Sequence, residues 1–389
     1  MTITKGPQGF PKSEYLRRLA AVKSEMARLD IETLFVVDVA NLTYLTGHWG
    51  APTTIPQGLI VSLREEEPAF IVRKMDVPAA HHQTFLQRGS VIGYPENLVA
   101  NPDKDGYDAV IDSINELGVS NRCLGIEQSA LPTPTIEKFK ARLPNAKILD
   151  CSNLVAWVRI VKSDLEISIM KEAAAITDAA IARAVEVIRP GMREADAAAE
   201  IVGTLIRGAN GKAGTGLQHF YLCASPRTST AHVWWTDDVF RQGSQINLEL
   251  GGKRLGYCAA IMRTFSIGQP SDRLRRMHEA EVAGLEAALA TVRPGATCSD
   301  VANAFYRTME KHGLAKESRC GYSLGINWLE KTASLRDGDM TELKPNMTFH
   351  LMLGNWVDED FGYVIGESFR VTETGSEVLT STPRKLFEL

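Results

Sequence analysis

The first part of the chain alternates amphipathic stretches of helical period with short apolar runs. The helical stretches occupy residues 13–29, 107–118 and 133–143, and the apolar runs of strand length occupy 33–38, 57–63, 68–76 and 123–129. Ser13 fits the N-cap position of the first helix. The alternation predicts an α/β domain with a mixed sheet.

The second part of the chain contains one order of elements twice. A long helical pattern begins at the capping box of Ser163 and Glu166, and a similar pattern begins at Ser271. Each runs to an Arg-Pro-Gly stop, at Pro190 and Pro294, and another amphipathic stretch follows. The offset is 294 − 190 = 104 residues. A repeat of this length predicts two α–β halves related by a pseudo-twofold axis.

Each half also contains runs in which apolar and polar residues alternate. The runs are 219–224 with 246–267 in the first half, and 347–353 with 363–372 in the second. Alternation of this kind is typical of strands with one buried face. We therefore expect each half to consist of two helices and a β-hairpin.

Composition limits the class of protein. A length of 389 residues favours two domains, which we place at 1–155 and 156–389 because the pattern changes between 151 and 161. With 43 basic and 47 acidic residues, and no Lys/Arg block, we expect neither a nucleic-acid nor a membrane partner. The residues before the first helical stretch lack the apolar h-region of a signal peptide, so we expect none, and no run approaches the ~20 apolar residues of a membrane span. The six cysteines form no C-x-x-C pair, which favours a reducing cytoplasm.

Several motifs resemble, in the right order, those of the pita-bread superfamily that includes methionine aminopeptidase, prolidase and creatinase. The most informative is GYCAAIMRTF at 256–265, where the superfamily usually has G-Y-x-S-D-x-T-R-T-F. VRIVKSDLEI, the two Pro-Gly stops, LKPNMTFHLMLG and VTETGSEVLT agree with it. The resemblance implies an α/β (α+β) chain, with a creatinase-like N-terminal domain before a C-terminal pita-bread domain.

The resemblance also locates the metal-ligand positions of the superfamily. Metal-dependent members hold two divalent ions with two aspartates, one histidine and two glutamates. At the five corresponding positions this chain has Glu249, Ala260, Tyr322, Met352 and Gly366. Ala, Met and Gly side chains cannot ligate hard cations, which require oxygen ligands. We therefore predict a metal-independent protein with no cofactor.

Two residues are candidates for catalysis. His232 aligns with a histidine that relatives use near the substrate and that creatinase uses as its acid–base group, and its near-neutral reference pKa suits both roles. Glu249 stands on the polar face of a strand whose other face packs Ile246, Leu248 and Leu250. It could attack the substrate, activate a water molecule or anchor a cationic group. A salt bridge to Lys253 or Arg263 is the structural alternative.

Further residues are candidates for substrate binding. Glu367 interrupts an apolar row formed by Tyr363, Ile365 and Phe369, and buried carboxylates are enriched at functional sites. His350 and Tyr322 could donate hydrogen bonds to a substrate carboxylate or leaving group. The tryptophans near the motifs could surround a delocalised cation, although core packing is the common role of each one. The full set of predicted substrate-binding residues is Glu367, Tyr322, His350, Trp356, Trp234, Glu330, His48 and Trp49.

The loop residues His48 and Trp49, and separately Glu330, carry further expectations. His48 and Trp49 lie between Gly47 and Gly50, which predicts the tip of a binding loop. By resemblance to the superfamily we expect a homodimer in which this loop closes the partner subunit's site. Glu330 follows the GYSLGI segment, where most charged side chains are merely solvated.

Two metal-free relatives indicate the chemistry. Of the site residues of creatinase, this chain retains only His232. The ectoine hydrolase family is more similar, because it has a glutamate where Glu249 stands and shares the style of ESRCGYSLGI, ELKPNMTFHLMLGNW and the terminal PRKLF. This chain departs from that family by lacking its Y-P-P-D-W segment. The hypothesis is a metal-independent hydrolase of a non-peptide C–N bond in a small zwitterion, led by ectoine-type cyclic amidines and osmolyte catabolism.

Three alternatives stay open from the sequence. A creatinase-like amidinohydrolase would share the metal-free chemistry. A peptidase similar to Xaa-Pro aminopeptidase would need the absent metal ligands. A catalytically inactive pita-bread binding module would need neither His232 nor Glu249.

Overall fold

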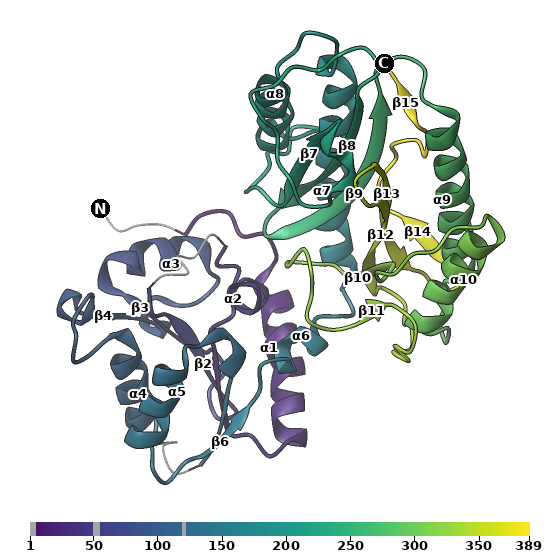
Figure 1. Cartoon of the computed structure of the whole chain (residues 1–389). Helices are drawn as coiled ribbons and strands as arrows, with labels where there is room; N and C mark the ends of the chain where they lie inside the picture. Colours follow the sequence, from purple (N-terminus) through teal and green to yellow (C-terminus); the bar gives the residue numbers. More distant parts are fainter. Residues whose placement is uncertain (1–4, 50–54, 119–121) are drawn as a thin grey trace. The chain divides into compact units, whose positions relative to one another are not determined.

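The computed structural model describes residues 5–49, 55–118 and 122–389. The chain forms two compact units, and the division falls after Arg159. We call residues 5–159 the N-terminal unit and residues 160–389 the C-terminal unit, and describe each by itself. Figure 1 labels the helices and strands of both units.

The N-terminal unit is built on one mixed sheet in the strand order β4-β3-β2-β1-β5-β6. Its strands are β1 (Thr33–Val36), β2 (Gly58–Ser62), β3 (Ala69–Arg73), β4 (Val91–Tyr94), β5 (Cys123–Ile126) and β6 (Lys147–Asp150). Its helices are α1 (Lys12–Arg28), α2 (Val39–Thr46), α3 (Val77–Gln83), α4 (Gly106–Glu116), α5 (Thr133–Arg142) and α6 (Leu154–Val158). The β1–β2 and β2–β3 pairs are antiparallel and the other pairs are parallel, so the predicted mixed sheet is present.

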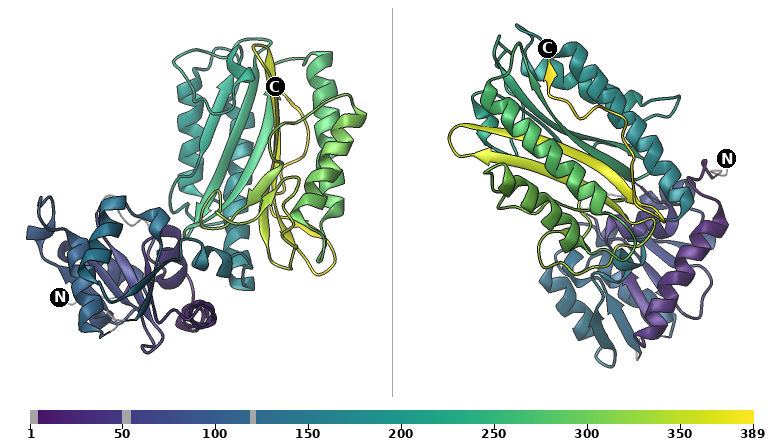
Figure 2. Two further views of the ribbon diagram at one scale, coloured as in Figure 1. Left: turned by 60° about the horizontal axis from the view of Figure 1, so that its bottom comes forward. Right: turned by 90° about the vertical axis from the view of Figure 1, so that its right-hand side faces the viewer.

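The C-terminal unit is built on a second, larger sheet whose main path is β11-β10-β12-β13-β9-β8-β7. Its strands are β7 (Phe220–Ala224), β8 (Gln245–Arg254), β9 (Tyr257–Ser266), β10 (Gly321–Ser323), β11 (Ser334–Leu335), β12 (Thr348–Val357), β13 (Phe361–Val371), β14 (Ser376–Val378) and β15 (Phe387–Glu388). Four helices lie along this sheet (Figure 2): α7 (Asp164–Val187), α8 (Glu194–Arg207), α9 (Asp272–Thr291) and α10 (Cys298–Lys311).

The predicted repeat is visible in this unit. Each half has a long helix, a shorter helix and a long hairpin, and the hairpins β8–β9 and β12–β13 meet at the pairing of Met262 with Gly366. Helix α7 begins at the predicted capping box of Ser163 and Glu166, and α9 begins at Ser271. The side-chain caps satisfy backbone N–H groups that have no partner within the helix.

Strand alternation separates the two faces of the large sheet. Ile246, Leu248 and Leu250 pack against α7 and α8 in one apolar core, and Phe349 and Leu351 pack against α9 and α10 in another. We call this helix-covered side the outer face. The residues between them point to the other side, which we call the inner face.

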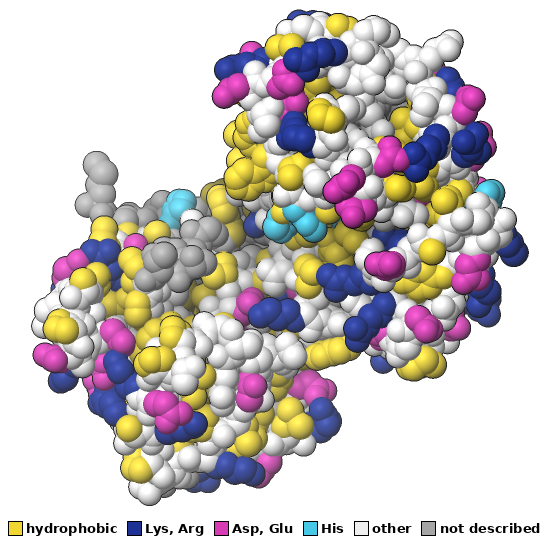
Figure 3. All heavy atoms as spheres, in the orientation of Figure 1, with side chains coloured by type: hydrophobic (Ala, Val, Ile, Leu, Met, Phe, Trp, Pro, Cys, Tyr) yellow, Lys and Arg dark blue, Asp and Glu magenta, His cyan; other side chains and the backbone are white. Residues whose placement is uncertain are grey.

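Acidic and basic side chains are interspersed on the face of the molecule drawn in Figure 3. No helix within residues 5–49, 55–118 and 122–389 is long and apolar enough to span a membrane.

Candidate active site

One row of paired residues crosses the inner face from β7 to β12. Tyr221 pairs with Glu249, Glu249 with Met262, Met262 with Gly366, and Gly366 with Met352. Side chains of directly paired residues stand on the same face. The row therefore has a carboxylate near one end and an apolar floor of Met262, Gly366 and Met352 beside it.

Glu249 is buried on this face, with 7% of its surface exposed. Among the residues that the structure describes, no hydrogen bond or ion pair to its carboxylate is found. Burial raises the pKa of this carboxyl to about 7. The predicted alternative of a salt bridge to Arg263 is wrong, because Arg263 faces the outer side and pairs there with Glu367. Glu249 is thus a buried acid whose charge the described protein does not neutralise.

His350 and Tyr322 stand beside this row, paired across β12 and β10. Their rings meet edge to face at 5.6 Å, and Trp328 meets the His350 ring at 5.5 Å. His350 is fully buried, both of its ring nitrogens lack a hydrogen-bond partner in the described part of the chain, and burial lowers its pKa to about 3. It is therefore a neutral imidazole with free hydrogen-bonding capacity.

The same imidazole explains the glycine in the row. A Cβ placed on Gly366 would lie 2.9 Å from His350 Nε2, so the ring occupies space that a side chain at 366 would need. Tyr322 has its pKa raised by burial and by the nearby charge of Glu249. Its hydroxyl therefore stays protonated and can donate a hydrogen bond at the site.

Trp328 lies over the β8 strand. A Cβ on Gly251 would meet the indole at 2.4 Å, so a glycine is needed for this close approach. The indole also meets the His219 ring edge-on at 5.3 Å. We call the ring-bearing residues around Glu249 the aromatic cup: His219, Tyr221, Tyr322, Trp328 and His350.

His232 lies at the rim of the cup, on the loop between the short helix Arg227–Ser229 and β8. Its side chain is exposed, and its ring meets Tyr221 edge-on at 5.2 Å. The structure thus brings together four of the predicted residues, Glu249, His232, Tyr322 and His350.

Glu367 is not part of this constellation. It shares the outer face with Ile365 and Phe369, and its carboxylate accepts hydrogen bonds from Arg263 at 2.7 Å and Thr380 at 2.7 Å. The apolar row that it interrupts lies on the helix-covered outer face. The expectation that Glu367 binds substrate is therefore corrected: the carboxylate neutralises the buried Arg263.

Glu330 supports a loop of the cup. It is buried, and the backbone N–H of Asn327 donates to its Oε1 at 3.2 Å. This carboxylate lies against Gly325, at the start of the segment that carries Trp328. It is neither a solvated charge nor, in this structure, a member of the cup.

Two predicted tryptophans lie elsewhere. Trp356 shares a face of β12 with His350 but stands six residues further on, ~20 Å along the strand, folded over Gly354 and Gly362. Trp234 is 64% exposed and stacks on Trp235 at 6.2 Å. The structure does not bring either residue into the cup.

The predicted loop tip of the N-terminal unit is also corrected in part. His48 is 5% exposed and packs edge-on against Phe70 of β3 at 5.2 Å, and burial lowers its pKa to about 4. Its side chain thus points into its own unit and not outward from a loop. Trp49 is half-buried, and residues 50–54 of the predicted loop lie outside the described residues.

His219 and Tyr221 are site residues that the sequence interpretation did not include. Strand alternation could have indicated Tyr221, because it stands between the apolar Phe220 and Leu222. His219 precedes the strand, and its contact with Trp328 joins segments more than a hundred residues apart, so no local pattern indicates it.

The donor atoms at this site do not fit the two-metal centre of the superfamily. Glu249 is the one carboxylate of the five ligand positions, and Met262, Gly366 and Met352 follow it on one side of the row. Within the described ranges no group of three or more His, Cys, Asp or Glu side chains could hold a metal ion.

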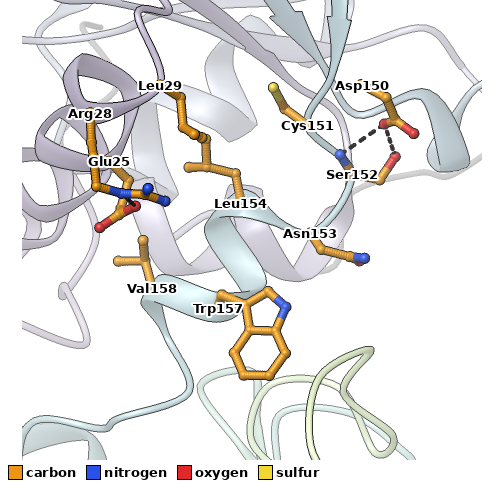
Figure 4. Close-up of a pocket in the computed structure, with 10 residues that line it drawn as sticks. All are labelled: Glu25, Arg28, Leu29, Asp150, Cys151, Ser152, Asn153, Leu154, Trp157 and Val158. Atoms are coloured by element: carbon orange, nitrogen blue, oxygen red, sulfur yellow. Dashed lines mark hydrogen bonds and ion pairs between the residues drawn. The ribbon is translucent and has the colours of Figure 1, made fainter.

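A cavity of about 490 Å³ lies elsewhere, in the N-terminal unit between α1, β6 and α6 (Figure 4). Leu29, Leu154 and Trp157 contribute its apolar wall. Two pairs of its polar residues are engaged with each other: Arg28 with Glu25 in a 2.8 Å ion pair, and the Ser152 backbone N–H with the Asp150 carboxylate at 3.0 Å. Burial raises the pKa of the Cys151 thiol to about 11, so it is no nucleophile at neutral pH.

Comparisons with known proteins agree with this architecture. Residues 168–373 match the metallopeptidase family M24, and residues 18–161 match the creatinase/prolidase N-terminal domain. An uncharacterized hydrolase/peptidase of Sinorhizobium fredii is 62% identical over 99% of this chain and 99% of its own. An ectoine hydrolase of Halomonas elongata is 34% identical over 97% of this chain and 98% of its own.

A solved structure shows the same fold. The X-Pro aminopeptidase of Thermotoga maritima resembles this chain with a TM-score of 0.83 and 21% identity, over 95% of this chain and 99% of that one. The chain belongs to family M24 and is a hydrolase of that family. The predicted resemblance to the pita-bread superfamily, with a creatinase-like N-terminal domain, is confirmed.

Proposed function

We propose that this protein is a metal-independent hydrolase of a non-peptide C–N bond in a small zwitterion, with ectoine-type cyclic amidines as the leading substrate class. The observation that carries the proposal is Glu249, a buried carboxylate inside a cup of aromatic rings, with no cationic partner among the residues that the structure describes. A desolvated carboxylate and aromatic faces both favour a delocalised cation such as an amidinium. The 34% identity to an ectoine hydrolase supports the substrate class.

The proposed reaction uses four residues of the site. Glu249 attacks the amidine carbon or activates a water molecule for that attack, and the positive charge of the amidinium makes this carbon electrophilic without a Lewis acid. His232 gives a proton to the departing nitrogen and takes one from the water, so that water is added across the broken C–N bond. Tyr322 and the neutral His350 donate hydrogen bonds to the substrate carboxylate.

The donor atoms at the site support the proposed metal independence. An oxygen-ligated metal centre would need carboxylates where this chain has Ala260, Met352 and Gly366, and His350 takes up the space above Gly366. The apolar floor of the row instead fits the hydrocarbon part of a small ring.

The test is ring-opening by purified protein after chelator treatment. Ectoine, hydroxyectoine and creatine are each incubated with it, and products are separated by chromatography. Opening of an ectoine that survives chelation is expected, whereas turnover of creatine alone would favour a creatinase-like amidinohydrolase. Xaa-Pro dipeptide cleavage that appears only with added manganese or cobalt would favour a peptidase. Binding of substrate without any turnover would favour a binding module.

A further inference from the structure

A chain of ring contacts ties the exposed His232 to the sheet. Tyr221 is paired with Glu249, so the two side chains leave the sheet next to each other. The Tyr221 ring stacks on His219 at 5.9 Å with an interplanar angle of 13°, and it meets the edge of His232 at 5.2 Å. The Tyr221 hydroxyl lies 3.4 Å from His219 Nδ1. The Trp328 indole also contacts the His219 ring, edge-on at 5.3 Å.

The position of His232 depends on these ring contacts. Its side chain is exposed on a loop, and in the described part of the structure its imidazole makes no hydrogen bond or ion pair. An exposed side chain without such contacts samples several rotamers. An acid–base group, however, must stay within hydrogen-bond reach of the reacting atoms.

We propose that Tyr221 is the positioning residue that keeps His232 at the rim beside Glu249, and that His219 holds Tyr221 in place. This inference rests on the proposed function only in the role that it gives His232 as acid–base group. The Tyr221 ring contacts His232 and also stacks on His219, and its hydroxyl adds a second contact with His219. Burial and the charge of Glu249 raise the pKa of Tyr221, so the hydroxyl stays protonated and can donate to His219.

Two substitutions separate the ring from the hydroxyl. Tyr221→Phe keeps the ring and removes the hydrogen bond, whereas Tyr221→Leu removes both. His219→Asn removes the stacked imidazole from a residue that is itself exposed, so it tests the anchor without a large change in the core. Tyr107→Leu in the N-terminal unit is the matched control for loss of a ring.

The first readout needs no activity. In the full chain with labelled histidine rings, the ring current of Tyr221 displaces the His232 proton resonances, which a His232→Asn variant assigns. We expect the displacement to be lost in Tyr221→Leu, kept in Tyr221→Phe and Tyr107→Leu, and reduced in His219→Asn. Unchanged His232 resonances in Tyr221→Leu overturn the role of Tyr221, and unchanged resonances in His219→Asn overturn that of His219. Where Tyr221→Leu does not fold, the His219→Asn result decides.

The second readout is the kinetics of ring-opening. Misplacement of His232 in Tyr221→Leu should lower kcat on the order of 10²-fold, which exceeds any rise in KM from loss of a ring of the cup, and Tyr221→Phe, which keeps the ring, should lower kcat less. A rise in KM at unchanged kcat would make Tyr221 a substrate-binding residue and overturn the proposal. If the parent protein opens no ring, the proposed function fails while the resonances of His232 still decide the positioning role.

Discussion

At the residue scale, two buried carboxylates of the C-terminal unit have opposite environments. The Glu367 carboxylate accepts hydrogen bonds from Arg263, Arg384 and Thr380. The Glu249 carboxylate, in contrast, has no hydrogen-bond or ion-pair partner among the described residues. A neutralised buried charge supports the fold, and an unneutralised one costs stability unless it is protonated or binds a ligand. The difference assigns Glu367 to the fold and supports the proposed role of Glu249 in the chemistry.

Replacement of Glu249 by Gln should therefore reduce activity and relieve a stability cost. Ring-opening should fall on the order of 10²-fold or more because the nucleophile or base is lost. The native pKa of about 7 lies above the usual 4.5, so the parent loses stability as pH rises from about 4.5 through 7, and the variant should not. The variant should gain on the order of 3 kcal/mol relative to the parent between pH 5 and pH 8 in urea denaturation.

Glu310→Gln on the exposed side of α10 is the control for this substitution. A Glu249→Gln protein that retains the parent rate would remove Glu249 from the chemistry. A relative stability that does not change with pH would contradict the raised pKa.

Replacement of Glu367 by Gln should have the opposite pattern. Arg263 is fully buried and would lose its charged partner, so the free energy of unfolding should fall by about 3–5 kcal/mol. Ring-opening per folded molecule, measured below the unfolding midpoint, should stay near the parent value. Loss of activity with unchanged stability would return Glu367 to the active site.

At the scale of elements, the site depends on the register of four long strands and on one loop. The β8–β9 and β12–β13 hairpins place Glu249, Met262, Gly366 and Met352 in one row. The loop after β10 then brings Trp328 down onto Gly251. A shift of one residue in any strand would exchange its inner and outer side chains.

Gly251→Ala tests the contact between this loop and the sheet. The added Cβ would meet Trp328 at 2.4 Å and the Ala259 carbonyl oxygen at 2.7 Å, so the indole must move. We expect a loss of about 1–3 kcal/mol in stability and a weaker affinity for substrate. Gly89→Ala is the control, because its added Cβ would meet nothing within 4 Å. Quenching of tryptophan fluorescence by the substrate, unchanged in Gly251→Ala, would show that Trp328 is not displaced.

At the scale of the whole molecule, buried titratable groups act on stability in opposite directions. Burial raises the pKa of Glu127 and Glu281 to about 7, and lowers that of His48 and His350 to about 4 and about 3. The raised carboxyl values cost stability as pH rises, and the lowered imidazole values cost stability as pH falls below about 6.5. The two sets partly cancel in the parent, so single variants reveal them best.

Glu281→Gln on α9 isolates one of these groups. Glu281 is fully buried, and Lys316 and Asn355 only partly oppose the effect of burial on its pKa. We expect the variant to gain stability relative to the parent as pH rises from about 5 to 8, in parallel denaturation series. A constant difference across that range would contradict the raised pKa of Glu281.

The oligomeric state is a separate prediction at this scale. From the resemblance to the superfamily we expect a homodimer of the 42.7 kDa chain, and light scattering coupled to size exclusion measures it directly. A monomer with full activity would show that no partner subunit completes the site.

The sequence by itself determined the periodic features of this protein. Hydrophobic period, the caps at Ser163 and Ser271 and the Pro-Gly stops predicted the mixed sheet, the long helices and the repeated hairpins, because these depend on neighbours along the chain. The predicted cap at Ser13 is wrong, because α1 begins at Lys12 after Pro11. The resemblance to the superfamily also indicated His232 as a candidate, and it placed Ala260, Met352 and Gly366, which have no oxygen ligand, at three of the five metal-ligand positions. Strand alternation indicated Glu249 as a second candidate.

Only the tertiary structure decided which of these residues meet. In the folded protein the Glu367 carboxylate pairs with Arg263, His48 packs against Phe70, and His219 and Trp328 meet in the cup. Each of these contacts joins residues that are well separated in sequence, and each depends on strand register or loop path. Local pattern carries no information on either, because a side chain's partner across a sheet is set by the packing of the whole unit.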